Sequence, residues 1–289
     1  MDPDLAYEVI VHNTPLTHTA GPVAENVKAE AARTSNELSN LANARNQRPE
    51  QRAATGQHLT HYHSFFFSLF SWENPRATAV AYAATIVFIF GARYLAHAHP
   101  AARQVVVELD GRLAELVREW FDLPRAPLLR IRVGEARAVT ESLSPATRDV
   151  VVRDVFAGAV TPEPLTTVEF ARHVRRVLAP GGLYVLNCGD TRDLAGARAE
   201  LAALSEVFEH VAAVADPAML KGRRYGNIVL AASSAPLPLE GSPGAAALGR
   251  ELLGGAVPAQ YKDEAWVRSF VGGTPPRHDP VAEGARDGA

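Results

Sequence analysis

The sequence predicts an α/β protein with a doubly wound, mostly parallel, Rossmann-like sheet, preceded by a disordered and hydrophobic, membrane-like N-terminal segment. From residue 104 onward, short apolar runs alternate with amphipathic stretches, which is typical of parallel sheets with helical crossovers. Acidic residues stand where several of the apolar runs end. In such sheets this is the edge where ligands bind.

Each predicted element rests on its own pattern of residues. Residues 111–120, for example, carry Leu113, Val117 and Trp120 at helical spacing, and Pro180-Gly181-Gly182 is a typical stop after a helix. The expected strands are 104–110, 128–133, 148–156, 183–188, 211–215 and 227–233, and the expected helices are 111–120, 134–143, 168–178, 195–208 and 261–271.

Composition narrows the classes of function. The chain has 289 residues and a formal net charge of −3, which argues against a broad basic field for nucleic acid, so we expect no nucleic-acid partner. Cys188 is the single cysteine, which excludes an internal disulfide and a cysteine-rich zinc site. It follows a buried strand, and we expect an inert core thiol.

The chain divides into four stretches of different character. Residues 1–60 are polar and expected to be disordered, and residues 61–99 are hydrophobic. Residues 100–235 form the α/β domain. Residues 236–289 are a Pro/Gly-rich extension, whose end, from residue 272, should be a loose tail.

The hydrophobic stretch has two interpretations. Residues 77–92 carry no charge, and a helix of that length would span about 24 Å, against a bilayer core of about 30 Å. With flanking arginines and aromatic residues, 61–95 could therefore enter a membrane. Alternatively TIVFIF, residues 85–90, is the first buried strand of the sheet.

Three histidines, His58, His61 and His63, precede that stretch. Three imidazoles on a turn can bind a transition metal. No carboxylate or cysteine supports them nearby in the sequence, so we expect ordinary polar residues and no metal.

The strand-end acids are Glu108, Asp110, Glu135 and Asp154. An acid at the end of the second strand of such a sheet can accept hydrogen bonds from both ribose hydroxyls of a nucleoside, and one after the third strand can reach an adenine amino group. The alternative is that Asp110 and Glu135 cap the helices that follow them.

The motifs VVVELD, RVGEAR, RDVVVRDVF and VRRVLAPGGLYVLN resemble those of the spermidine synthase family, over about residues 103–275. The resemblance implies a methyltransferase-like fold and a decarboxylated S-adenosylmethionine or S-adenosylmethionine donor, with no metal. It implies transfer of an aminopropyl (or methyl) group to a small-molecule amine. By position, Glu108 matches the family's ribose-binding acid, Glu135 the adenine-side acid, and Asp154 the acid that helps deprotonate the attacking amine. Asp110 is a further candidate for cofactor binding.

Departures from that family predict impaired activity. The glycine-rich first loop is replaced by a single Gly91, and the family's N-terminal β-hairpin domain has no counterpart. The second acid for the diamine is replaced by Ala157. Arg153, beside Asp154, adds a charge of the wrong sign for a cationic substrate.

The stretch from about residue 14 to 95, including WENPRA and the apolar run after it, resembles the start of a fungal reticulon. That resemblance implies insertion into the endoplasmic reticulum membrane; without insertion, we expect a cytoplasmic protein. It also gives an alternative function, a reticulon-like membrane-associated protein with a non-catalytic α/β domain. The oligomeric state is not predicted.

Overall fold

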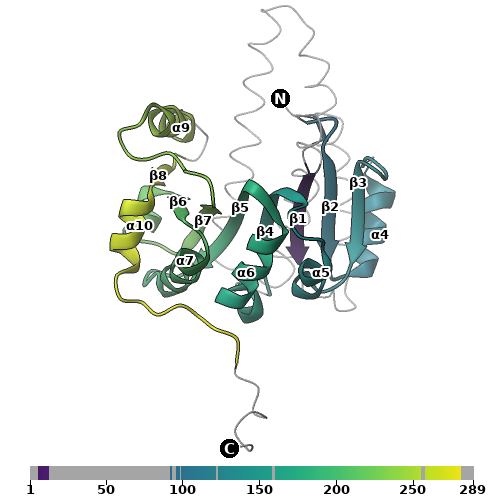
Figure 1. The fold of residues 1–289 in the computed structure, drawn as a ribbon, viewed down its shortest axis with the longest axis horizontal. Coiled ribbons are helices and arrows are strands. Elements are labelled where there is room, and N and C mark those ends of the chain that lie inside the picture. The colour runs from purple at the N-terminus through teal and green to yellow at the C-terminus, as the bar shows by residue number, and fades with distance from the viewer. Residues whose placement is uncertain are drawn as a thin grey trace, which may run out of the picture.

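A central sheet of eight strands organises the protein (Figure 1). The computed structural model describes residues 6–12, 92, 96–97, 99–121, 123–157, 160–254 and 258–280. The strand order is β3-β2-β1-β4-β5-β7-β6-β8. The strands are β1 (Ala6–His12), β2 (Arg103–Glu108), β3 (Leu129–Val133), β4 (Arg148–Val155), β5 (Leu178–Asp190), β6 (His210–Ala215), β7 (Gly226–Ser233) and β8 (Gln260–Lys262).

Strands β1 to β5 run parallel, whereas β7 is antiparallel to both of its neighbours, β5 and β6. This is the doubly wound, methyltransferase-like arrangement, and the predicted fold class is confirmed. The helices are α4 (Gly111–Trp120), α5 (Ala136–Ser142), the short 3₁₀ helix η1 (Glu163–Leu165), α6 (Val168–Val177), α7 (Ala195–Val207), α8 (Pro217–Leu220), α9 (Pro243–Gly254) and α10 (Glu264–Val271).

The first strand along the chain is not the one that the alternative interpretation of the hydrophobic stretch predicts. Ala6–His12 pairs with β2 on one side and β4 on the other, which is the place that this interpretation gives to residues 85–90. It also lies inside the stretch 1–60 that we had expected to be disordered, so that expectation is wrong for these seven residues. Residues 85–90 lie outside the described part of the chain. The residue after the first strand is Asn13, so Gly91 does not follow that strand.

Strand β5 begins directly where α6 ends, without the loop expected at Pro180-Gly181-Gly182. The register of β4 against β5 shifts between Arg148 and Val150, which accommodates these residues as an irregularity. Gly182 is required there, because a Cβ atom would come within 3.0 Å of the Ala179 carbonyl oxygen and 3.1 Å of two more carbonyl oxygens.

Two hydrophobic clusters cover the two faces of the sheet. Helices α5, α6, α7 and α10 bury their apolar residues on one face (Figure 1). The larger cluster there includes Phe170, Tyr184 and Leu201. Helix α4 packs on the other face, against β2 and β3, through Leu113 and Val117. Alternate residues of the same strands therefore belong to different hydrophobic clusters, one on each face of the sheet.

The C-terminal segment is held in place more firmly than a loose tail would be. We call residues 274–280 the C-terminal strap. The backbone N–H of Val168 donates to the carbonyl oxygen of Arg277 (2.9 Å), and the N–H of Asp279 donates to Glu169 Oε2 (2.9 Å). The Asp279 carboxylate also forms an ion pair with Arg137 on α5. Our expectation of a loose tail from residue 272 is thus wrong as far as residue 280.

Among the described residues, no helix has the length and apolar character needed to cross a membrane. Apart from Ala92, the reticulon-like stretch and its three histidines lie outside the described part of the chain.

Candidate active site

The strand-end acids lie at one edge of the sheet, because β2, β3 and β4 are parallel and end there. Ile10 of β1 pairs with Val107 of β2 and with Arg153 of β4. The next residues, Glu108 and Asp154, therefore lie at the same level and on the same face of the sheet. One strand separates them, so their backbones are roughly 10 Å apart.

Glu108 lies at the carboxyl end of β2 with its side chain wholly buried. Its Oε1 accepts a hydrogen bond from the backbone N–H of Asp110 (2.9 Å). This contact orients the carboxylate at the turn between β2 and α4. A ligand that binds to Glu108 must first displace the atoms that cover its side chain, because the carboxylate is not accessible from solvent.

Asp110 and Glu135 are both helix N-caps. Asp110 Oδ1 accepts from the backbone N–H groups of Arg112 (2.8 Å) and Leu113 (3.1 Å) at the start of α4. Glu135 caps α5 with both carboxylate oxygens, which accept from Arg137 N–H (2.9 Å) and Ala138 N–H (2.8 Å). The capping alternative is thus confirmed for both. Asp110 Oδ2 accepts neither of these bonds, and each Glu135 oxygen accepts only one of them, so capping does not exclude a contact with a ligand.

Asp154, near the end of β4, is 6% exposed. The side-chain amide of Asn187, on the neighbouring strand β5, donates from Nδ2 to Asp154 Oδ1 at 3.0 Å. Burial raises the pKa of the Asp154 carboxyl, while the hydrogen bond from Asn187 and the positive charge of Arg153 act in the opposite direction. A carboxylate with a raised pKa holds a proton more readily, as a general base must.

The positive charge of Arg153 does not face the acids, contrary to our expectation. Successive side chains on a strand point to opposite faces, so Arg153 enters the core beneath α7. Its guanidinium forms an ion pair with Glu200 at 2.6 Å, and both side chains are nearly fully buried (1% and 4% exposed). It also donates to the carbonyl oxygens of Leu165 (2.6 Å) and Asn187 (3.3 Å). The charge next to Asp154 is thereby paired on the far face.

Cys188 lies on the same face as Arg153 and is 1% exposed. Burial, the largest influence, raises the pKa of its thiol far above the ordinary range. The neighbouring Tyr184 is also buried, and its pKa is raised to about 12. A neutral thiol in this position agrees with the prediction of an inert core residue.

The position of the second family acid carries no charge here. Ala157 forms an isolated bridge with Val160 just beyond β4 and is exposed. Among the residues that the structure describes, no group of three or more histidine, cysteine or acidic side chains could hold a metal ion.

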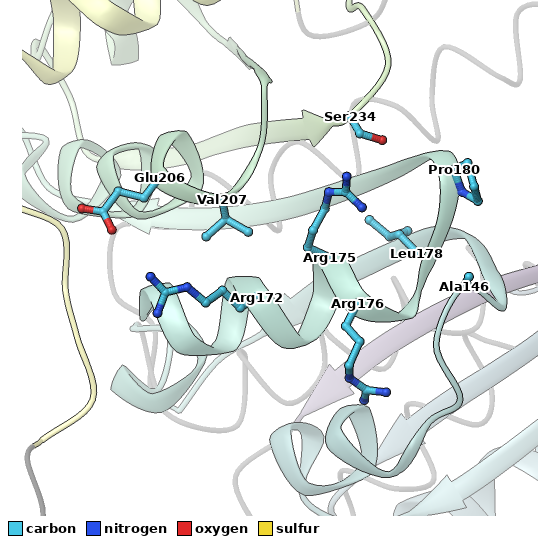
Figure 2. A pocket seen from close by; sticks show the side chains of 9 residues that line it. All are labelled: Ala146, Arg172, Arg175, Arg176, Leu178, Pro180, Glu206, Val207 and Ser234. Carbon is cyan, nitrogen blue, oxygen red and sulfur yellow. The ribbon is translucent and has the colours of Figure 1, made fainter.

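A hollow of about 610 Å³ lies at the opposite, amino-terminal edge of the parallel strands (Figure 2). Arg175 points towards Ser234 there, whereas Arg176 turns away to α5, where it donates to the carbonyl oxygen of Leu143 (2.8 Å). None of the strand-end acids lines this hollow. We therefore do not place the donor site in it.

Two residues of the carboxyl edge were missed in the sequence. Asn187 stands inside the predicted strand 183–188, and only the pairing of β4 with β5 brings it to Asp154. Glu200 lies on α7, 47 residues from Arg153. A buried Arg at an alternate position of an apolar strand was a signal that an acid must lie opposite.

No family model matches the chain. The solved structure of a probable spermidine synthase from Corynebacterium glutamicum is 62% identical, covering 66% of this chain and 69% of that one, with a TM-score of 0.64. The curated polyamine aminopropyltransferase of Vibrio vulnificus is 28% identical over 102 residues, or 35% of this chain. That match spans only 34% of the Vibrio protein's length.

The reticulon resemblance finds no support in these comparisons. The membrane and endoplasmic reticulum predictions that followed from it are equally unsupported.

Proposed function

The chain belongs to the spermidine synthase family, and on that premise we propose that its carboxyl edge binds an S-adenosylmethionine-type donor and transfers a group from it to a small amine. The observation that carries the proposal is the placement of Glu108 and Asp154 at one level and on one face, one strand apart. That spacing suits a nucleoside donor, whose ribose and reacting carbon are separated by several bonds.

Glu108 is the proposed ribose contact. It ends β2, the strand whose terminal acid accepts from both ribose hydroxyls in nucleoside-binding sheets of this kind. Asp110 and Glu135 would contribute at the ribose and adenine sides through the lone pairs that helix capping leaves available. Donor binding to the full chain is the first requirement of the proposal.

Asp154 is the proposed catalytic base. In the reaction, the lone pair of a neutral amine nitrogen attacks the methylene next to the sulfonium of decarboxylated S-adenosylmethionine. The carbon–sulfur bond breaks and its electron pair stays on sulfur, which leaves neutral methylthioadenosine. The nitrogen is then positively charged, and its proton passes to the Asp154 carboxylate. The burial that raises the pKa of Asp154 favours this transfer.

The proposed acceptor is a small amine, and the proposal does not require it to carry a second amino group. Ala157 offers no second carboxylate for a second ammonium group. The pairing of Arg153 with Glu200 on the far face offsets the unfavourable charge that the sequence suggested, so an amine can approach Asp154 from the other face.

The testing experiment measures release of methylthioadenosine from decarboxylated S-adenosylmethionine with putrescine and with monoamines. Asp154→Asn should lower turnover by about 100-fold or more, the usual contribution of a positioned general base. Glu209→Gln, at the opposite edge of the sheet, is the matched control and should behave as wild type. No product with any acceptor, or undiminished turnover in Asp154→Asn, would favour a non-catalytic domain.

A further inference from the structure

The amide of Asn187 lies beside the carboxylate of Asp154 through adjacent strands in register. Arg153 pairs with Leu186 across β4 and β5, so Asp154 and Asn187, the next residue in each strand, share a face of the sheet. Nδ2 of Asn187 donates to Asp154 Oδ1 at 3.0 Å. The backbone carbonyl oxygen of Asn187 is itself held by Arg153 at 3.3 Å. Asn187 is thus held through its side-chain amide on one face of the sheet and through its backbone carbonyl by a side chain from the other face.

The other end of this amide is buried and lacks a donor. Asn187 Oδ1 is inaccessible to solvent, and no donor among the described residues lies within hydrogen-bond distance of it. Buried acceptors are satisfied in the great majority of cases, and leaving one without a donor is costly. A rotation of the amide that exchanged Oδ1 and Nδ2 would break its hydrogen bond to the ionised Asp154, because Nδ2 is the only donor group of the side chain. A bound molecule that displaces what covers this oxygen and donates an N–H to it would satisfy it.

We propose that Asn187 is a further substrate-binding residue of this site, whose Oδ1 accepts one N–H of the acceptor amine while Asp154 accepts the other. This inference rests on the proposed function. A neutral primary amine has two N–H groups and one lone pair, and two acceptors on adjacent strands hold both N–H groups. The lone pair then points away from the sheet, to the side from which the donor carbon can be attacked.

A neutral amide suits this position better than a second acid would. Two carboxylates about 3 Å apart cannot both ionise near neutral pH, so one would hold the proton that the reaction must accept. Asn187 provides the second acceptor without that competition. The described charges around Asp154 fit this arrangement: Arg153, on its own strand, faces the other side, and Glu108 on β2 lies beyond β1.

The test compares wild type with Asn187→Leu and Asn187→Asp in the full chain. For Asn187→Leu we expect kcat/KM for the amine to fall about 10-fold or more, the loss that follows from one missing hydrogen bond in a buried site. The affinity for methylthioadenosine should be unchanged, because Asn187 is not placed at the nucleoside. Asn187→Asp keeps the acceptor and adds a charge, so the acid limb of its pH–rate profile should move to higher pH.

A readout independent of turnover is the titration of Asp154 itself, followed by NMR of chains labelled with ¹³C at the aspartate carboxyls and assigned with Asp154→Asn. Loss of the amide donor in Asn187→Leu should raise the titration midpoint of Asp154. The matched control is Ser233→Ala, which removes a buried hydrogen bond to the Gly182 carbonyl oxygen at the other end of the sheet and should leave both readouts unchanged.

The outcomes separate this inference from the proposed function. If wild type turns over amines but Asn187→Leu retains its kcat/KM, or if Ser233→Ala loses as much, the inference is wrong and the proposed function stands. If wild type binds no donor and releases no product, both fail together.

Discussion

Arg153 and Asp154 are adjacent in the sequence and serve opposite faces of β4. Arg153 is buried with Glu200 beneath α7, while Asp154 faces Asn187 on the side proposed for substrate. The strand thus carries a structural ion pair and a proposed catalytic acid on consecutive residues. Arg153 also donates to the carbonyl oxygens of Leu165 in η1 and Asn187 in β5, so the paired guanidinium ties both segments to β4.

Glu200→Gln is predicted to destabilise the protein by about 3 kcal/mol or more, because it leaves a buried guanidinium without its counter-charge. The free energy of unfolding by chemical denaturation measures this. The matched control is Glu115→Gln, which breaks the exposed pair with Arg112 (68% and 70% exposed) and should cost under about 1 kcal/mol. If the free energy of unfolding falls by the same small amount in both variants, Arg153 and Glu200 do not form a buried ion pair.

Asp154→Asn is predicted to stabilise the protein at pH 8 while it lowers turnover. Burial raises the pKa of Asp154 in the folded state above its value of about 3.9 in the unfolded chain. The ionised carboxylate therefore costs stability, about 1.4 kcal/mol for each pKa unit of elevation. This cost grows as the pH rises from the unfolded pKa to the folded pKa and is absent below about pH 4.

Thermal unfolding of wild type and Asp154→Asn between pH 4 and pH 8 checks this prediction. The stability difference should favour the variant at high pH and shrink as the pH falls. A variant that is less stable than wild type at pH 8 would mean that the carboxylate is stabilised by its surroundings, contrary to the buried position of Asp154.

Asp279→Asn is predicted to release the C-terminal strap. The hydrogen bond from Arg137, the largest influence, lowers the pKa of Asp279. A depressed aspartate pKa contributes stability above the unfolded value of about 3.9, which is lost as the pH falls through the folded pKa. The strap of wild type should therefore be as loosely attached as that of Asp279→Asn only at acidic pH, where Asp279 is protonated.

Hydrogen exchange at the Val168 amide, which donates to the carbonyl oxygen of Arg277, measures attachment of the strap. Exchange at neutral pH should be faster in Asp279→Asn than in wild type, and Glu209→Gln, away from the strap, should exchange as wild type does. Unchanged protection in Asp279→Asn would show that the Arg137 contact does not hold the strap.

Local sequence patterns predicted the fold between residues 104 and 233 because each strand and helix there has its own periodicity. Helix α4 was found with its observed bounds, since its apolar residues recur at helical spacing. Strand β1 was missed although AYEVIVH is rich in strand-forming residues. Its partners Arg103 to Val107 lie 97 residues further along the chain, and no local pattern shows such a pairing. Helix α9 was missed because it is rich in alanine and glycine and none of its residues is fully buried.

The edge of the sheet that carries the site was predictable from the acids at the ends of the predicted strands. Glu108, Asp110, Glu135 and Asp154 all lie at the carboxyl edge, as parallel strands require. Strand alternation already places Arg153 on the face opposite Asp154, so its assignment beside the substrate was an avoidable error. The neighbours of Asp154 were not predictable, because they depend on the register between strands, and Asn187 meets Asp154 only through the pairing of β4 with β5.

Calorimetric titration of methylthioadenosine into the full chain and into Glu108→Gln tests the central claim most directly. The account predicts that wild type binds and that Glu108→Gln binds at least about 10-fold more weakly, since it loses the charge on a hydrogen-bonding acceptor. Equal affinity in the two proteins, or no binding by wild type, would contradict a nucleoside site at the carboxyl edge of the sheet.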